Sequence, residues 1–210
     1  MDVDDHYLMT KLKFEEYKNT VKEQSENFII NELPTFIIEL EELLTNPQFQ
    51  TPKDNSVPTP GDLVTKNSQL TQIMDVIKPF LLQLTEGCNL LVTWMSFQSV
   101  KITCQSTADN VIESDVMTGA QQIVTTRFKL FNRCLNYFGD RGKIVEDMFS
   151  YPNIAAYQRA IDEIDRKVHL ALFKHLTNIK KLCCTLYDTS RNHLEKIKNP
   201  KPEGATDFST

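Results

Sequence analysis

Residues 154–198 read IAAYQRAIDEIDRKVHLALFKHLTNIKKLCCTLYDTSRNHLEKIK, and apolar side chains recur in this stretch at every third or fourth position. That spacing places them on one face of an α-helix, while charged residues cover the other faces. The predicted apolar stripe is Tyr157, Ile161, Ile164, Val168, Leu172, Leu176, Ile179, Leu182, Cys183, Leu186, Leu194 and Ile197. A helix of this length with one apolar face is typical of a helical bundle.

Three further segments show the same period, and no segment has the alternation of a strand. They span about 8–45, 68–102 and 115–149. Pro34 and Pro79 lie inside the first two and should kink them, and Ser68 is a plausible N-cap for the second. In the third, the predicted inward-facing residues are Val116, Ala120, Ile123, Val124, Phe128, Phe131, Leu135, Phe138, Val145 and Met148. The sequence therefore predicts an all-α fold, an antiparallel up-down-up-down four-helix bundle that forms one domain over 1–210.

The predicted connections differ in character. Residues 46–67 contain four prolines and few large apolar residues, which is typical of a linker, and this linker is long for a compact domain. Residues 103–114 are mostly polar and include Asp and Asn, which favour turns, so we predict a tight loop there. Tyr151-Pro152-Asn153 should separate the last two helices, and 199–210 reads as a polar tail.

The helix order places two of these connections together. In an up-down-up-down bundle the loop at 103–114 and the C-terminal tail lie at one pole, and the linker and the Pro152 turn lie at the other. A polar loop beside a free carboxylate is a plausible docking set for a partner protein.

Composition argues against several classes of protein. The chain has 210 residues and a net charge of −5, whereas a general nucleic-acid binder usually carries a basic excess. No stretch approaches the ~18–20 uncharged apolar residues of a membrane span, and the acidic start Met1-Asp2-Val3-Asp4-Asp5 is unlike a signal peptide. We therefore expect a protein inside the cell that binds neither nucleic acid nor membrane.

No catalytic or metal site can be assembled from the sequence. The neighbouring carboxylates, such as Glu163 and Asp165, diverge on a helix, and there is no Glu-x-x-His pair and no phosphate-binding glycine motif. The five cysteines form no Cys-x-x-Cys pair and read as small apolar residues, while Trp94 continues an apolar stripe. We predict a protein that is not an enzyme and that holds no metal and no cofactor.

Several short motifs stand in a fixed order along nearly the whole chain. The first group is Asn67-Ser68-Gln69-Leu70, Ile77-Lys78-Pro79 and Cys88-Asn89 followed by Trp94. The second group is Tyr137-Phe138-x-x-Arg141-Gly142, Tyr151-Pro152, Glu163-Ile164-Asp165, Leu186-Tyr187-Asp188 and Leu194-Glu195-Lys196-Ile197-Lys198-x-Pro200. In order and spacing they resemble the REG (11S) family of proteasome activators.

The resemblance implies a function. Members of that family form heptameric rings that cap the core proteasome without using ATP, and they occur in the cytoplasm and the nucleus. Their C-terminal tails enter pockets between the proteasome's alpha subunits. By resemblance, the docking tail here is Asp207, Phe208, Ser209 and Thr210, with the Thr210 carboxylate pairing with a lysine of the pocket.

The resemblance also implies that the loop after the second helix displaces the gate of the proteasome. Relatives typically carry Asp-Gly-Asn-Asn-Phe-Gly-Val in this activation loop, and the glycines are missing here. A gapless count places Thr107 at the key asparagine, whereas a shift of three residues aligns Asp109-Asn110-Val111 with the loop. The candidate residues are Thr107, Ala108, Asp109, Asn110 and Val111, and we prefer the shift, because asparagine can bond backbone groups in a strained turn.

Two other readings stay open. If Thr107 holds the key position, the protein binds proteasomes and opens them poorly. A different class is a helical scaffold or adaptor that uses its amphipathic faces to bind partner helices, and a monomer or dimer in solution would favour it.

Overall fold

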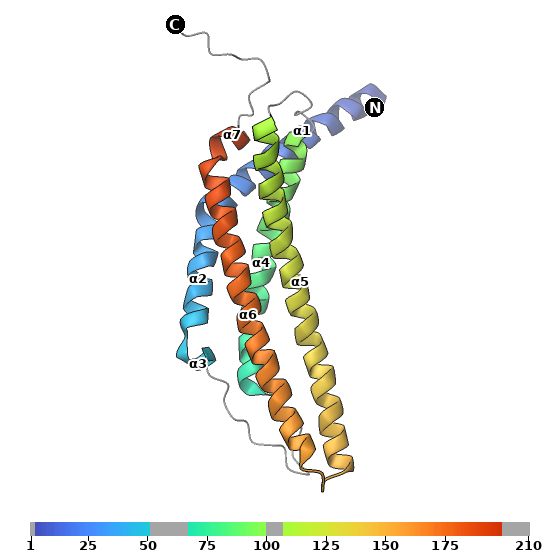
Figure 1. Ribbon diagram of the computed structural model, residues 1–210. Helices are drawn as coiled ribbons and strands as arrows, with labels where there is room; N and C mark the ends of the chain where they lie inside the picture. Colours follow the sequence, from blue (N-terminus) through green and yellow to red (C-terminus); the bar gives the residue numbers. More distant parts are fainter. Residues whose placement is uncertain (1–2, 51–66, 100–106, 199–210) are drawn as a thin grey trace. The chain divides into compact units, whose positions relative to one another are not determined.

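The computed structural model describes residues 3–50, 67–99 and 107–198, and within these ranges the chain is helical apart from short connections, with no strand (Figure 1). The chain divides into two compact units. Unit 1 comprises Met1–Ile37, Leu84–Val124 and Leu182–Thr210, and unit 2 comprises Ile38–Gln83 and Thr125–Lys181. None of the described helices is long and apolar enough to cross a lipid bilayer.

The first predicted helix, 8–45, is divided in the structure. It comprises α1 (Val3–Asn27), a π-helical turn η1 (Phe28–Glu32) and α2 (Leu33–Thr45), followed by the short α3 (Pro47–Gln50). Pro34 lacks an N–H, and its ring would clash with the carbonyl of Ile30 in a regular α-helix. The turn accommodates this with a wider bond from the Leu33 N–H to the Phe28 carbonyl, which is a common way to interrupt a helix.

The second helix, α4, spans Ser68–Ser99 and continues through Pro79. Its N-cap is Asn67, one residue before the predicted Ser68, because the Leu70 N–H donates to Asn67 Oδ1 at 3.0 Å. An N-cap side chain reaches the amide three residues on, which identifies Asn67 and not Ser68 as the cap. The prediction of Ser68 was therefore wrong.

The third helix, α5, spans Thr107–Ser150, so the predicted loop at 103–114 was wrong over 107–114. Thr, Asp and Asn favour the start of a helix as well as turns, and the pattern alone could not separate the two. A turn over residues 151–155 follows, where Tyr151-Pro152-Asn153 stands, and then come α6 (Ala156–Asn192) and α7 (Leu194–Lys198).

Unit 1 has an apolar core drawn from α1, η1, α4, α5 and α6. Trp94 is 2% exposed, so it packs in the core as its place in the stripe predicted. Cys88 and Cys183 are fully buried, and burial raises the pKa of the Cys88 thiol to about 12. These cysteines serve as small apolar residues.

Unit 2 packs segments of α2, α4, α5 and α6 that run alternately up and down (Figure 1). On α5 the predicted inward-facing Phe128, Leu135 and Phe138 are instead 56%, 71% and 45% exposed. The buried residues of α5 here are Leu130, Tyr137, Arg141 and Val145. Val145 was predicted correctly, but over residues 128–138 the prediction chose the wrong phase. There Tyr137 and, one turn on, the buried Arg141 occupy the core face, while large apolar residues occupy the face beside it.

Gly87 of α4 lies where a side chain would overlap the ring of Phe28, which is 1% exposed. Although alanine is the better helix former, Gly87→Ala should lower the free energy of unfolding by about 1–3 kcal/mol, because the buried ring has to move. Urea denaturation at one protein concentration measures the change.

Gly139→Ala on α5 is the matched control, since no atom lies within 4 Å of the added methyl group. It should raise the free energy of unfolding by up to about 1 kcal/mol through helix propensity alone. Equal effects of the two substitutions would contradict the packing argument.

Candidate functional site

One end of unit 1 brings together the elements on which the predicted site lies. α4 ends there at Ser99, α5 begins at Thr107 and α7 ends at Lys198 (Figure 1). Residues 107–111 form the first turn of α5, and Val111 is 54% exposed. The predicted docking tail, Asp207, Phe208, Ser209 and Thr210, lies outside the described residues. The helix ends therefore meet at one pole, as the helix order predicts.

Three aromatic rings on α1 and α4 make a cluster in the same unit. The ring centroid of Phe97 lies 5.9 Å from that of Phe14 and 6.1 Å from that of Tyr17, both edge to face. Phe14 and Tyr17 are 47% and 50% exposed. The sequence alone does not single these rings out, because each belongs to an ordinary helical pattern and only the packing of α1 on α4 joins them.

Unit 2 contains a buried polar network centred on the carboxylate of Asp165 on α6. Asn67 Nδ2 donates to Oδ2 at 2.9 Å, Tyr137 Oη donates to Oδ1 at 2.8 Å, and Arg141 Nε donates to Oδ1 at 3.1 Å. All four residues are less than 9% exposed. Each of the four belongs to one of the short motifs of the sequence, but the sequence alone gives no sign that these motifs meet at one carboxylate.

The environment of Tyr137 in this network keeps its phenol protonated. Burial, followed by the hydrogen bond and the charge of Asp165, raises the pKa of Tyr137 well above its ordinary value. The phenol therefore stays a hydrogen-bond donor at any physiological pH. A tyrosine that cannot ionise and a carboxylate paired with arginine suit a structural role, and no acid–base pair of the catalytic kind is formed.

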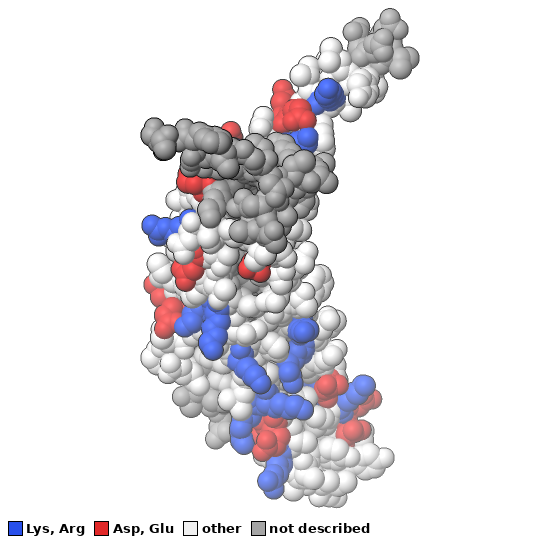
Figure 2. Space-filling model, turned by 45° about the horizontal axis from the view of Figure 1, so that its top comes forward, with Lys and Arg blue, Asp and Glu red and all other residues white. Residues whose placement is uncertain are grey.

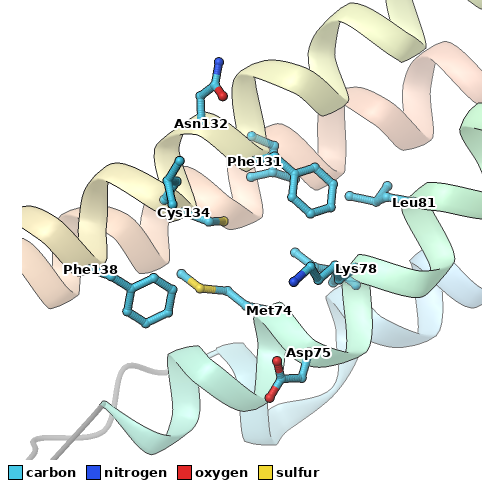
Figure 3. A pocket seen from close by; sticks show the side chains of 11 residues that line it. Met74, Asp75, Lys78, Leu81, Phe131, Asn132, Cys134 and Phe138 are labelled. Carbon is cyan, nitrogen blue, oxygen red and sulfur yellow. The ribbon is translucent and has the colours of Figure 1, made fainter.

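A cleft of about 300 Å³ lies between α4 and α5 of unit 2 (Figure 3). Met74, Phe131 and Phe138 point into it, and Asp75 and Lys78 stand on the α4 side. Cys134 also lines the cleft, but burial raises the pKa of its thiol to about 11, so it is no nucleophile at neutral pH. The cleft is suited to hold an apolar group and carries no arrangement for covalent chemistry.

Two family models match the chain. The model described as the C-terminal part of proteasome activator PA28 matches residues 63–207, and the model of the N-terminal part matches residues 9–63.

Curated relatives cover the chain over nearly its full length. "Proteasome activator complex subunit 3" of Homo sapiens is 21% identical, over 93% of this chain and 94% of that protein. "Proteasome activator complex subunit 2" of Bos taurus is 23% identical, over 89% of this chain and 90% of that protein.

A solved structure shows the same fold. The crystal structure of the 11S subunit of the Plasmodium falciparum proteasome, PA28, superposes with a TM-score of 0.80 at 20% identity. The match covers 92% of this chain and 95% of that one. The predicted all-α four-helix fold is confirmed.

Replacing Asp165 by asparagine should strongly destabilise the protein. The substitution removes the negative charge beside Arg141 in a buried site and should lower the free energy of unfolding by about 3–5 kcal/mol. Tyr137→Phe removes one donor only and should cost about 1–2 kcal/mol. Urea denaturation measures both.

The exposed pair Glu163–Arg166, beside Asp165 in the sequence, supplies a control. Glu163→Gln should change the free energy of unfolding by no more than about 0.5 kcal/mol, because solvent screens an exposed ion pair. If Asp165→Asn and Glu163→Gln had the same small effect, the network would not be a main source of stability.

Proposed function

The chain belongs to the PA28 family of proteasome activators, and on this premise we propose that it caps the core proteasome and stimulates its peptidase activity without a catalytic step of its own. The observation that carries the proposal is the run of two family models over residues 9–207. The pole described above agrees with it, because the start of α5 and the end of α7 lie at one end of unit 1. No ATP or other cofactor enters the proposal.

We propose that the cap is a ring of seven identical subunits. This proposal is supported by the apolar side chains that the helices of this chain leave exposed. Leu135 on α5, Leu170 on α6 and Ile38 on α2 are 71%, 62% and 59% exposed, and contact with neighbouring copies would cover such side chains. Seven copies of a 24.2 kDa chain give an assembly of roughly 170 kDa.

The C-terminal tail, which follows α7, makes the docking contacts. Asp207, Phe208, Ser209 and Thr210 enter pockets between the alpha subunits of the proteasome, with the Thr210 carboxylate on a lysine. Each tail binds weakly. A ring presents seven at once, and effective concentration can raise the overall avidity by roughly 10²–10⁴.

Gate opening is the role of the first turn of α5, Thr107 to Val111. We assign the key role to Asn110, with Thr107 as the competing position. A second candidate function is a cap that binds the proteasome and leaves the gate closed, and the missing glycines of this segment favour it. A scaffold that never meets the proteasome is a third, and a monomeric or dimeric chain would support it. The place of action is the cytoplasm, the nucleus or both.

Deleting Phe208–Thr210 should abolish binding to the core proteasome, because the tail supplies the docking contacts. The measurement is stimulation of short-peptide hydrolysis by purified core proteasome, together with co-sedimentation. Native mass should stay at roughly 170 kDa, since the tail is not needed for the ring. Full stimulation by the truncated chain would refute the docking role.

Asn110→Ala should leave binding intact and reduce peptide hydrolysis, because the docking tails are untouched while the gate contact is lost. Thr107→Ala is the matched control in the same turn of helix. Co-sedimentation reports binding and peptide hydrolysis reports opening. The reverse result, with Thr107→Ala inactive and Asn110→Ala normal, would assign the role to Thr107.

A further inference from the structure

The contacts inside unit 2 fix the order of its four helical segments. Lys180 of α6 pairs with Glu41 of α2, and a groove separates α2 from α4. The apolar cleft lies between α4 and α5, and Asp165 joins α5 to α6. The helices therefore follow one another around the bundle as α2, α4, α5 and α6. It follows that the α2/α4 side and the α5/α6 side are opposite faces of unit 2.

The α2/α4 face is an acidic groove with an apolar floor. The groove has a volume of about 390 Å³, and Leu40, Leu43, Val76 and Phe80 line it together with Glu39 and Glu42. Both glutamates are exposed, and neither carboxylate has a hydrogen bond or ion pair within the part of the chain that the structure describes. Val76 is 52% exposed, so a large apolar side chain also stays uncovered at this groove.

The α5/α6 face is basic. Lys129 and Arg133 lie one turn apart on α5, Lys174 lies on α6, and all three are exposed. Burial, and then the charges of Arg133, Lys174 and Lys129, lower the pKa of His175, which shows that the three cations act on one half-buried site. Figure 2 shows lysine and arginine side chains, in blue, gathered on the face that is turned toward the viewer. Within the described ranges, none of these three cations has a carboxylate partner.

We propose that neighbouring copies of this chain meet through these two faces, the acidic α2/α4 groove of one copy receiving the basic α5/α6 face of the next. Leu170, one turn before Lys174 on α6, gives the basic face an exposed apolar side chain to place over the groove. Because the two faces differ and lie on opposite sides, each copy can contact two neighbours, and such head-to-tail contacts close into a ring when the rotation allows. The inference rests on the proposed ring and names the residues that hold it.

Charge favours a second copy over other partners. A nucleic acid or another polyanion would match the basic face and leave the acidic groove unexplained, whereas a second copy satisfies both. Complementary charges chiefly set which partner binds and in which register, and like charges placed opposite one another oppose assembly strongly. The charges therefore determine which face of one copy binds which face of the next. Contact between apolar side chains such as Val76 and Leu170 buries apolar surface.

Charge reversal on the full-length chain tests the proposal. Glu39→Lys with Glu42→Lys makes both faces basic, and Lys129→Glu with Arg133→Glu makes both faces acidic. Each pair should raise the concentration for half-assembly at least ~10-fold, measured by native mass spectrometry and sedimentation. A chain that carries all four substitutions should assemble again, because its faces are once more complementary. It should not mix with the wild-type chain.

Glu16→Lys with Glu23→Lys on α1 is the control, since it changes net charge as Glu39→Lys with Glu42→Lys does, at two exposed sites of unit 1, whereas both faces belong to unit 2. It should assemble as the wild type does. Far-UV circular dichroism checks that every variant is helical. For the unmodified chain, half-assembly should need a higher concentration at 0.5 M than at 0.1 M salt, because salt at roughly these levels screens exposed charges.

Normal assembly of either two-residue variant would overturn the proposal. So would a four-residue variant that does not assemble, or assembly of the unmodified chain that does not depend on salt. A wild-type chain that forms no ring would instead overturn the proposed function together with the inference. Stimulation of the proteasome is measured separately, so a ring that assembles as described and never binds the proteasome would leave the inference standing.

Discussion

The buried carboxylate of Asp165 is the constraint on which unit 2 depends. Its three donors come from three places in the chain: Asn67 before α4, and Tyr137 and Arg141 on α5. A carboxylate in a core is tolerated only when its charge is paired and its lone pairs are bonded. Since Asn67 also caps α4, the one carboxylate sets where α4 begins and how α5 lies against α6.

This interior network also decides what the surface presents. Once Tyr137 and Arg141 of α5 point inward to Asp165, the helical period turns Phe131, Leu135 and Phe138 toward α4 and Lys129 and Arg133 toward α6. One side of α5 is therefore apolar and the other basic. The faces proposed for assembly follow from the placement of one buried ion pair.

The described residues suit a protein that acts by binding. The buried thiols of Cys88 and Cys134 have pKa values raised to about 12 and 11, so neither is ionised at neutral pH. The cleft between α4 and α5 is apolar and holds no acid–base pair. The end of α4, the start of α5 and the end of α7 meet at one pole of unit 1, and the faces proposed for assembly lie in unit 2. Capping a larger particle requires both kinds of surface, because weak single contacts hold only when an assembly repeats them.

The sequence by itself determined the helical class, the breaks near Pro34 and Pro152, and the family. It also determined that the end of α4, the start of α5 and the end of α7 meet at one pole. The sequence suffices for this, because period, proline chemistry and motif order are local properties of the chain. It misjudged the start of α5, since Thr, Asp and Asn suit a turn and a helix N-terminus equally. It also misjudged the phase of the middle of α5, over residues 128–138, where it assigned Phe128, Leu135 and Phe138 to the core. Only the tertiary structure decided that phase, because a helix with apolar residues on two faces turns inward whichever face its neighbours can satisfy. Here a carboxylate on α6 attracted the face that carries Tyr137 and Arg141.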